Sequence, residues 1–167
     1  VGMVFIGLAI GCPLIGMMSE YFQSRLVFMR LSSILSSIIL SIVIYIHFFV
    51  PGFNPSETLW YVLLLLYGIV NSGIIPSYAL ASEVNKKEVT GMAIGFTNMA
   101  SVIFGAIFIP IVGWILDSVW GGQIHSGAPV YTETNYEIAF LLLPICLVLS
   151  FVLTFFIKET HCKNVAS

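Results

Sequence analysis

Residues 89–116 read VTGMAIGFTNMASVIFGAIFIPIVGWIL, a run of 28 residues without a charged side chain. A helix that crosses a lipid bilayer needs about 20 consecutive apolar residues. Four more charge-free runs occur, at 1–19, 31–56, 58–82 and 138–157. The sequence therefore predicts an all-α membrane protein with five spanning helices, near 1–18, 26–49, 58–82, 90–116 and 137–157.

The composition is that of a membrane protein. Of the 167 residues, 59% are hydrophobic and 8% are charged, and the mean hydropathy is +1.04. A soluble domain averages about 25% charged residues, and a nucleic-acid-binding protein needs basic residues, whereas the formal net charge here is −2. A membrane β-barrel would alternate apolar and polar residues, which Val62–Leu66 does not do. A soluble enzyme, a nucleic-acid binder, a disordered tail and a barrel are excluded.

The basic residues indicate how the helices are oriented. Positive residues mark the cytoplasmic side of a membrane protein. Because successive helices alternate in direction, all six fall on one side of the membrane, in three groups: Arg25 with Arg30, Lys86 with Lys87, and Lys158 with Lys163. We therefore expect a multi-pass protein of the plasma membrane with a cytoplasmic tail at 158–167.

This orientation places residue 1 outside the cell, at the start of an apolar run. The run lacks the basic segment and the cleavage site of a signal peptide. A first helix that enters from outside normally follows an earlier helix. We therefore expect at least one further helix before Val1 in the natural protein.

A stripe of polar and aromatic residues follows one face of the helix expected at 58–82. Tyr67, Asn71 and Tyr78 share this face, and such side chains are costly toward lipid. They indicate either the lining of a substrate cavity or aromatic packing against the next helix. Asn71 is the strongest candidate because it lies near mid-membrane. On the next helix, Asn98 is either a hydrogen-bonding contact between helices or a ligand contact.

Glycine divides the helices into two kinds. The helices expected at 1–18, 58–82 and 90–116 contain glycine, and the other two contain none. Small residues allow close helix approach in lipid, so we expect these three to form the packed interior and the other two to face lipid. One narrow stripe of 90–116 predicts a packing groove for another helix, through Gly91, Gly95, Gly105 and Gly113.

The sequence contains no arrangement typical of catalysis or metal binding. Cys12 and Cys146 lie within expected helices, and the adjacent His161 and Cys162 have no further metal ligands beside them in the sequence. No charged residue occupies the middle of a span, where proton-relay groups normally lie. We expect neither an enzyme nor a cofactor or metal.

Three short motifs bear on the family. The first is Gly16-Met-Met-Ser-Glu20-Tyr-Phe-Gln-Ser-Arg25, which resembles the cytoplasmic loop signature of the major facilitator superfamily, G-x-x-x-D-x-x-G-x-[RK]. Gly16, Glu20 and Arg25 match in position, with Glu20 in place of aspartate and Gln23 in place of glycine.

The other two motifs follow in the order that this family has. Residues 81–91, ASEVNKKEVTG, resemble its A-x-E-x(n)-R-G turn into a cavity helix, with Thr90 where arginine is often found. Lys158-Glu159-Thr160 is similar to the ending of the last helix in many members.

The resemblance implies a fold and a function. The five helices look like transmembrane helices 8 to 12 of a twelve-helix bacterial transporter, so that 1–167 would be an incomplete C-terminal six-helix bundle in the inner membrane. Such a protein moves a small solute by alternating access, and nutrients such as amino acids are one class of cargo. Gly16, Glu20 and Arg25 would belong to a cytoplasmic gating loop.

The implied partners are the solute, a coupling proton or sodium ion, the lipid bilayer and the missing N-terminal half of the same transporter. The alternative is a small self-contained membrane scaffold or assembly subunit without transport activity. That alternative predicts a start codon near residue 1 and stable isolation of the chain.

Overall fold

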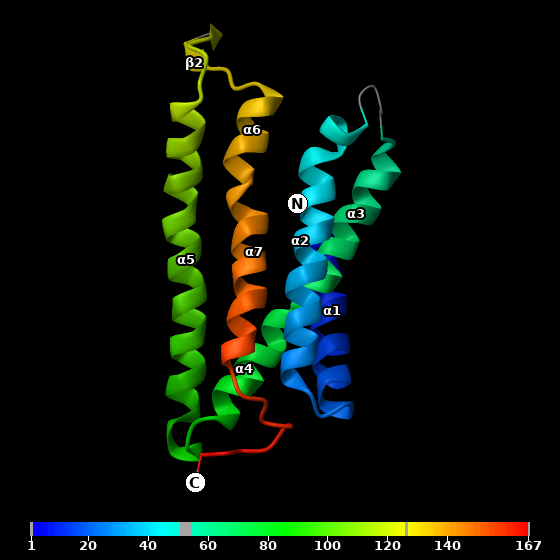
Figure 1. The fold of residues 1–167 in the computed structure, drawn as a ribbon, viewed down its shortest axis with the longest axis vertical. Helices are drawn as coiled ribbons and strands as arrows, with labels where there is room; N and C mark the ends of the chain where they lie inside the picture. The colour runs from blue at the N-terminus through cyan, green and yellow to red at the C-terminus, as the bar shows by residue number, and fades with distance from the viewer. Residues whose placement is uncertain (1, 51–54, 126, 167) are drawn as a thin grey trace.

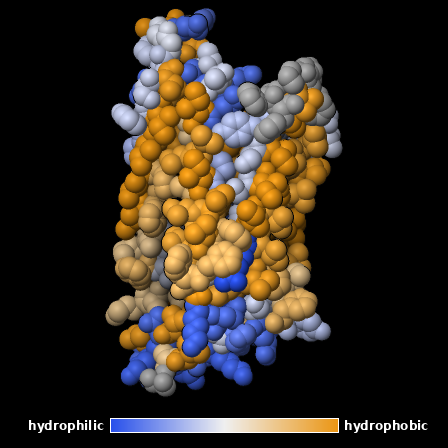
Figure 2. All heavy atoms as spheres, viewed as in Figure 1, coloured by the Kyte–Doolittle hydropathy of each residue, from blue (hydrophilic) through white to orange (hydrophobic). Residues whose placement is uncertain are grey.

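The computed structural model describes residues 2–50, 55–125 and 127–166. Over these residues it consists of helices and one short hairpin, and five helical segments are long and apolar enough to cross a membrane. Figure 2 shows a broad hydrophobic band between two more hydrophilic ends. The expected all-α membrane fold with five apolar spans is confirmed.

Three spans run without interruption. They are α1 (Gly2–Tyr21), α2 (Arg25–Phe49) and α5 (Thr90–Ser118), the last preceded by the 3₁₀ turn η2 (Lys87–Val89). A continuous helix makes its backbone hydrogen bonds within itself, as the lipid interior requires.

The third span is broken near its middle. We expected one continuous helix at 58–82, but the structure has α3 (Glu57–Val70), the 3₁₀ turn η1 (Asn71–Gly73) and α4 (Ile74–Glu83). Asparagine, serine and glycine are all poor helix formers compared with the leucines before them. The break therefore falls at the weakest helix-forming point of the span.

The fifth span is also divided. It consists of α6 (Glu133–Phe140), α7 (Leu142–Leu153) and the 3₁₀ turn η3 (Thr154–Phe156). Pro144 lacks an N–H group and crowds the preceding turn, which accounts for the interruption at Leu141. The span begins before the expected residue 137, because a polar first turn extends the helix beyond its apolar run.

A short polar connection joins α5 to α6. Within it, β1 (Ile124–His125) pairs antiparallel with β2 (Ala128–Pro129). The Tyr131 hydroxyl donates a hydrogen bond to the Asp117 carboxylate at 2.5 Å, which fastens the connection to the end of α5.

The helices form two groups that α2 and α4 connect. Figure 1 shows α1, α2 and α3 together on one side and α5 beside α6 and α7 on the other. Helix α4 leaves the first group and contacts α5, and α2 contacts α7.

Glycine brings α1 and α3 together in the most extensive helix contact of the described chain. A Cβ atom built on Gly7 would lie 2.9 Å from the Gly68 Cα, and one built on Gly11 would lie 2.8 Å from the Ile69 Cα. Real side chains do not tolerate such distances to backbone atoms, so these two helices can approach this closely only with glycine at both positions.

The expected division into interior and lipid-facing helices does not hold within this chain. Helix α2, expected outside, buries Ser32, Ser36 and Ser37, whereas α5, expected inside, buries none of its residues. Serine is small and polar, so it packs closely and bonds across helices just as glycine allows close approach. The Ser37 hydroxyl, for example, donates to the Pro144 carbonyl at 3.2 Å.

The four glycines expected to form a packing groove lie on α5, at positions that no described residue covers. A Cβ atom built on any of them would meet nothing within 4 Å among the described residues: Gly91, Gly95, Gly105 and Gly113. No other described element packs on this stripe, and its role as a groove for another helix stays a prediction.

Gly68→Ala tests the α1–α3 contact. The added methyl group would lie 3.0 Å from the Gly7 Cα and still closer to the Val4 carbonyl oxygen, so the two helices must separate. Overpacking of this kind costs about 1–3 kcal/mol, and we expect a lower melting temperature for the purified protein in detergent. Gly121→Ala, which adds the same methyl group in open space in the connection after α5, is the control. Equal melting temperatures for both variants would contradict the close contact.

Candidate functional site

Three segments that are distant in the sequence meet at one end of the bundle. They are the turn between α1 and α2, the connection between α4 and α5, and residues 157–166, which we call the strap. We call this end the polar end, because Figure 2 shows a concentration of hydrophilic residues there.

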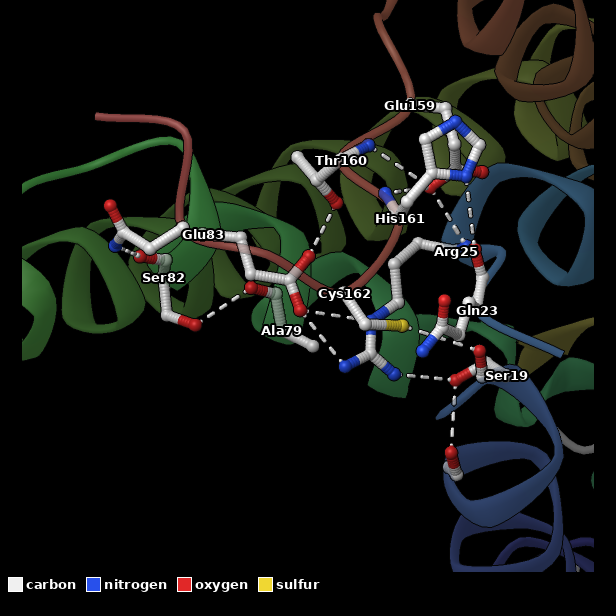
Figure 3. Close-up of polar contacts among 12 residues, drawn as sticks. Ser19, Gln23, Arg25, Ala79, Ser82, Glu83, Glu159, Thr160, His161 and Cys162 are labelled. Carbon is white, nitrogen blue, oxygen red and sulfur yellow. Dashed lines mark hydrogen bonds and ion pairs between the residues drawn. The ribbon is translucent and has the colours of Figure 1, made fainter. Parts of the chain in front are cut away.

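A buried ion pair forms the centre of the polar end (Figure 3). The Arg25 guanidinium donates to one Glu83 carboxylate oxygen from Nη2 at 2.9 Å and from Nε at 3.1 Å. Its Nη1 donates to the Ser19 hydroxyl at 2.8 Å. Each of the two charged side chains is only 11% exposed. The pair thus connects the start of α2, the end of α1 and the end of α4.

The strap completes the coordination of Glu83. The Thr160 hydroxyl donates to the second carboxylate oxygen of Glu83 at 2.5 Å, and the Val165 N–H donates to the Glu83 carbonyl at 2.8 Å. The Asn164 amide donates to the Asn85 carbonyl at 2.8 Å. A buried carboxylate needs partners on both oxygens, and Arg25 and Thr160 supply them.

Glu159 caps the start of α2 from the far end of the chain. Its carboxylate accepts hydrogen bonds from the N–H groups of Arg25 at 3.0 Å and Leu26 at 2.8 Å, and from the Ser24 hydroxyl at 3.0 Å. Ser24, the residue at the N-cap position, makes no capping hydrogen bond itself. A negative charge at a helix N-terminus also interacts favourably with the helix dipole.

The surroundings of Glu159 shift its pKa. Partial burial alone would raise the pKa of the carboxyl, but the bonds from Leu26, Arg25 and Ser24 favour the ionised form and bring its pKa below the ordinary value. The carboxylate therefore stays charged, as its capping position requires.

The expected gating residues lie at this end in different surroundings. Arg25 is at the centre of the ion pair, whereas Glu20 is exposed and its side chain makes no hydrogen bond or ion pair among the described residues. Glu159, and not Glu20, is the carboxylate at the N-terminus of α2. A Cβ atom on Gly16 would only touch Ile75 at 3.4 Å. Their role as a gating loop stays a prediction.

Gln23 has a backbone conformation that explains the motif. Its φ is 47°, in the left-handed region that favours glycine. The related loop signature has glycine at this position. The turn between α1 and α2 therefore keeps the shape that the signature encodes, although the residue differs.

Two of the expected cavity residues contact each other across α4 and α5. The Tyr78 hydroxyl donates to the Asn98 side-chain oxygen at 3.2 Å. Asn98 is exposed within the described chain, although it lies inside a span. An exposed amide in a span is costly toward lipid and favourable toward water or another polar surface.

Asn71 lies apart from that pair, at the break in the third span. It borders a cavity of about 360 Å³ between α2, α4 and α7, with Leu8 of α1 at one side. Tyr67 is half-buried one turn earlier, does not border this cavity and makes no hydrogen bond among the described residues. The structure therefore divides the predicted stripe, because the 3₁₀ turn changes the direction of the residues after it.

Sequence reasoning gave no site role to several residues of these sites. Ser19 and Ser32 bond across helices. Ser19 occupies a variable position of the motif at 16–25, and Ser32 lies outside the three motifs. Glu83 belongs to the motif at 81–91 and Thr160 to the motif at 158–160. These two motifs are the sequence signal from which a contact between the two residues could have been predicted.

The part of the chain that the structure describes contains no group of three or more His, Cys, Asp or Glu placed to hold a metal ion. The three cysteines form no disulfide bond with one another: Cys12, Cys146 and Cys162.

The chain was compared with known protein families, curated proteins and solved structures. A model of the family described as the Major Facilitator Superfamily matches residues 1–166. No curated protein and no solved structure matches the chain.

Arg25→Met tests the ion pair. It leaves the Glu83 carboxylate buried without a counter-charge, and removing one partner of a buried pair costs about 3–5 kcal/mol. We expect a large fall in melting temperature in detergent, which the double variant Arg25→Met/Glu83→Gln should partly reverse. Lys87→Met, which removes an exposed charge, is the control. An unchanged melting temperature for Arg25→Met would show that the pair does not stabilise the fold.

The pH dependence of stability tests the cap. Because the pKa of Glu159 is lower in the folded protein than in the unfolded chain, its stabilising effect is complete above the unfolded pKa of about 4.3. That effect is lost as the pH falls through the folded pKa. We expect melting temperature to fall more steeply below about pH 4.3 for the native protein than for Glu159→Gln. Glu88→Gln, at an exposed position, should follow the native curve. Parallel curves for native protein and Glu159→Gln would contradict the capping role.

Proposed function

The chain belongs to the major facilitator superfamily of membrane transporters, and on this basis we propose that it moves a small solute across the membrane by secondary active transport. Solutes such as amino acids and other nutrients are candidates, and a proton or sodium ion would drive the movement. The membrane would be the inner membrane of a bacterium.

The break in the third span carries this proposal. Transporters often build their solute sites from interrupted helices near mid-membrane, where freed backbone groups and polar side chains meet the solute. The third span has its interruption at Asn71–Gly73, about midway along Glu57–Glu83, beside a cavity lined in part by hydroxyl and amide groups. A scaffold subunit would have no need for such a break.

Polar side chains of the third and fourth spans would line the path of the solute. We assign Asn71 at the cavity and the Tyr78–Asn98 pair to the transport path, and we place Tyr67 beside it. The exposure of Asn98 within a span supports this assignment, because a water-filled path would hydrate an amide that lipid would not.

The uncovered stripe of α5 supports a two-bundle transporter. We propose that this chain is most of the C-terminal bundle and that the stripe with Gly91 and Gly95 packs against a helix of the remaining transporter. Nothing described here covers these glycines, and close packing across glycine is a common way for membrane helices to associate.

The polar end would be the cytoplasmic gate. Its three segments carry Arg25, Lys86, Lys87, Lys158 and Lys163, which favours a cytoplasmic location for this end and for the strap. Gly16, Glu20 and Arg25 would belong to this gate. Alternating access then requires contacts of the polar end, such as Arg25–Glu83, to form in one state and to loosen in the other.

Tyr78→Phe tests the transport path. It removes only the hydroxyl group that bonds to Asn98, and the loss of such a bond corresponds to about a twofold to tenfold effect. We expect uptake to fall by that factor with membrane insertion unchanged, measured with a solute found by a growth screen of a deletion strain.

Tyr61→Phe is the control, since Tyr61 is exposed and makes no hydrogen bond among the described residues. If Tyr78→Phe and Asn98→Ala both transport like the native protein, the pair does not belong to the path. If no solute depends on the protein for uptake, the scaffold alternative gains support.

A further inference from the structure

One serine hydroxyl bridges the break in the third span. Ser32 of α2 donates a hydrogen bond to the Val70 carbonyl and accepts one from the Gly73 N–H at 3.0 Å. Val70 immediately precedes η1, and Gly73 is its last residue. Because unpaired backbone groups are costly in a membrane, Ser32 stabilises the broken form of the helix.

This contact distinguishes Ser32 from other serines of α2. Ser33 and Ser41 donate to carbonyls of their own helix, Met29 at 2.9 Å and Ser37 at 2.8 Å. Ser32 instead lies so close to η1 that a Cβ atom on Gly73 would overlap its side chain. The break is therefore held by α2, and it does not rest on weak helix propensity alone.

The cavity of about 360 Å³ begins at this bridge. Its polar lining consists of one amide and four hydroxyl groups, from Asn71, Ser32, Ser33, Ser77 and Ser150. Its other lining residues are glycine and apolar side chains, and none of the lining residues carries a charge. The cavity is within the size range of about 300–1,000 Å³ that is typical of small-molecule sites.

The hydrogen-bonding capacity of the cavity is partly free. The hydroxyl of Ser77 donates to the Ile74 carbonyl at 2.6 Å, as Ser33 does to its own helix, so both keep oxygen lone pairs for an incoming donor. The Asn71 amide makes no hydrogen bond among the described residues, and it offers both donors and an acceptor. The cavity therefore complements a group that both donates and accepts.

We propose that this cavity is a recognition subsite for an uncharged, hydrogen-bonding group of the transported solute, such as a hydroxyl or a carboxamide. The Asn71 side chain contacts the solute. Ser32 is a positioning residue, because it holds η1 in the conformation that keeps Asn71 in the cavity lining. The assignment of a solute rests on the proposed transport function, whereas the charge preference of the cavity does not.

The same lining disfavours a charged group of the solute. A charged group within a membrane span is stable only with a partner of opposite charge or with water around it. The lining provides hydroxyl and amide groups but no counter-charge. An uncharged group exchanges its water for equivalent hydrogen bonds and avoids this penalty.

Uptake kinetics test the roles of Asn71 and Ser32. Asn71→Leu keeps the approximate side-chain size without polar atoms, and we expect a KM about twofold to tenfold higher with a nearly unchanged maximal rate. Ser32→Ala should raise KM in the same way, and Ser32→Thr, which retains the hydroxyl, should restore it in part. Ser41→Ala, whose hydroxyl bonds only within α2, should behave like the native protein.

Thiol labelling tests the charge preference without any transport. The three native cysteines are first replaced by serine, and a single cysteine is introduced by Ser77→Cys. We expect the neutral reagent hydroxyethyl methanethiosulfonate to label it, and the cationic trimethylammonium-ethyl reagent to react about tenfold more slowly or less. The exposed variant Glu88→Cys should react readily with both reagents.

The outcomes separate this inference from the proposed function. Equal labelling of Ser77→Cys by both reagents, or no labelling by either, would overturn the uncharged subsite. A KM unaffected by Asn71→Leu in a transporting protein would also overturn it, and a KM unaffected by Ser32→Ala would remove the positioning role. If labelling prefers the neutral reagent while no solute is transported, the cavity keeps its assigned chemistry and the transport function fails.

Discussion

The Arg25–Glu83 ion pair connects the segments on which the polar end depends. It is buried, so each charge must be compensated by a direct partner. Arg25 has Glu83 and Ser19, and Glu83 has Arg25 and Thr160. Because these partners come from α1, α2, α4 and the strap, one pair determines how four segments of the chain meet.

The same requirement explains the middle of the bundle. Lipid supplies no hydrogen bonds, so the freed backbone groups of the broken third span need a partner from the protein. Ser32 provides it from α2. The polar end and the break are both connected through α2, so a movement of α2 against α4 would act on both together.

The number and type of the spans could be predicted from the sequence, because charge-free runs of this length have one stable solution in lipid. The interruptions could not, because the break at Asn71–Gly73 depends on Ser32, a residue about 40 positions away. Glycine content was also misleading for packing: α2 has no glycine yet packs through serine, and the glycine stripe of α5 has no partner among the described residues. Among the charged residues, the resemblance pointed to Arg25 and Glu20 of the loop. The carboxylate that caps α2 is Glu159, which only the folded chain brings to that position.

The central claim is that this bundle belongs to a secondary transporter. The most direct measurement is solute accumulation by the purified transporter in liposomes, with a metabolite mixture outside, an imposed ion gradient, and mass spectrometry of the vesicle contents. The account predicts that at least one small solute accumulates above the level in protein-free liposomes, and that this accumulation disappears when the gradient is collapsed. Vesicle contents identical to those of protein-free liposomes under proton and sodium gradients of either direction would contradict it.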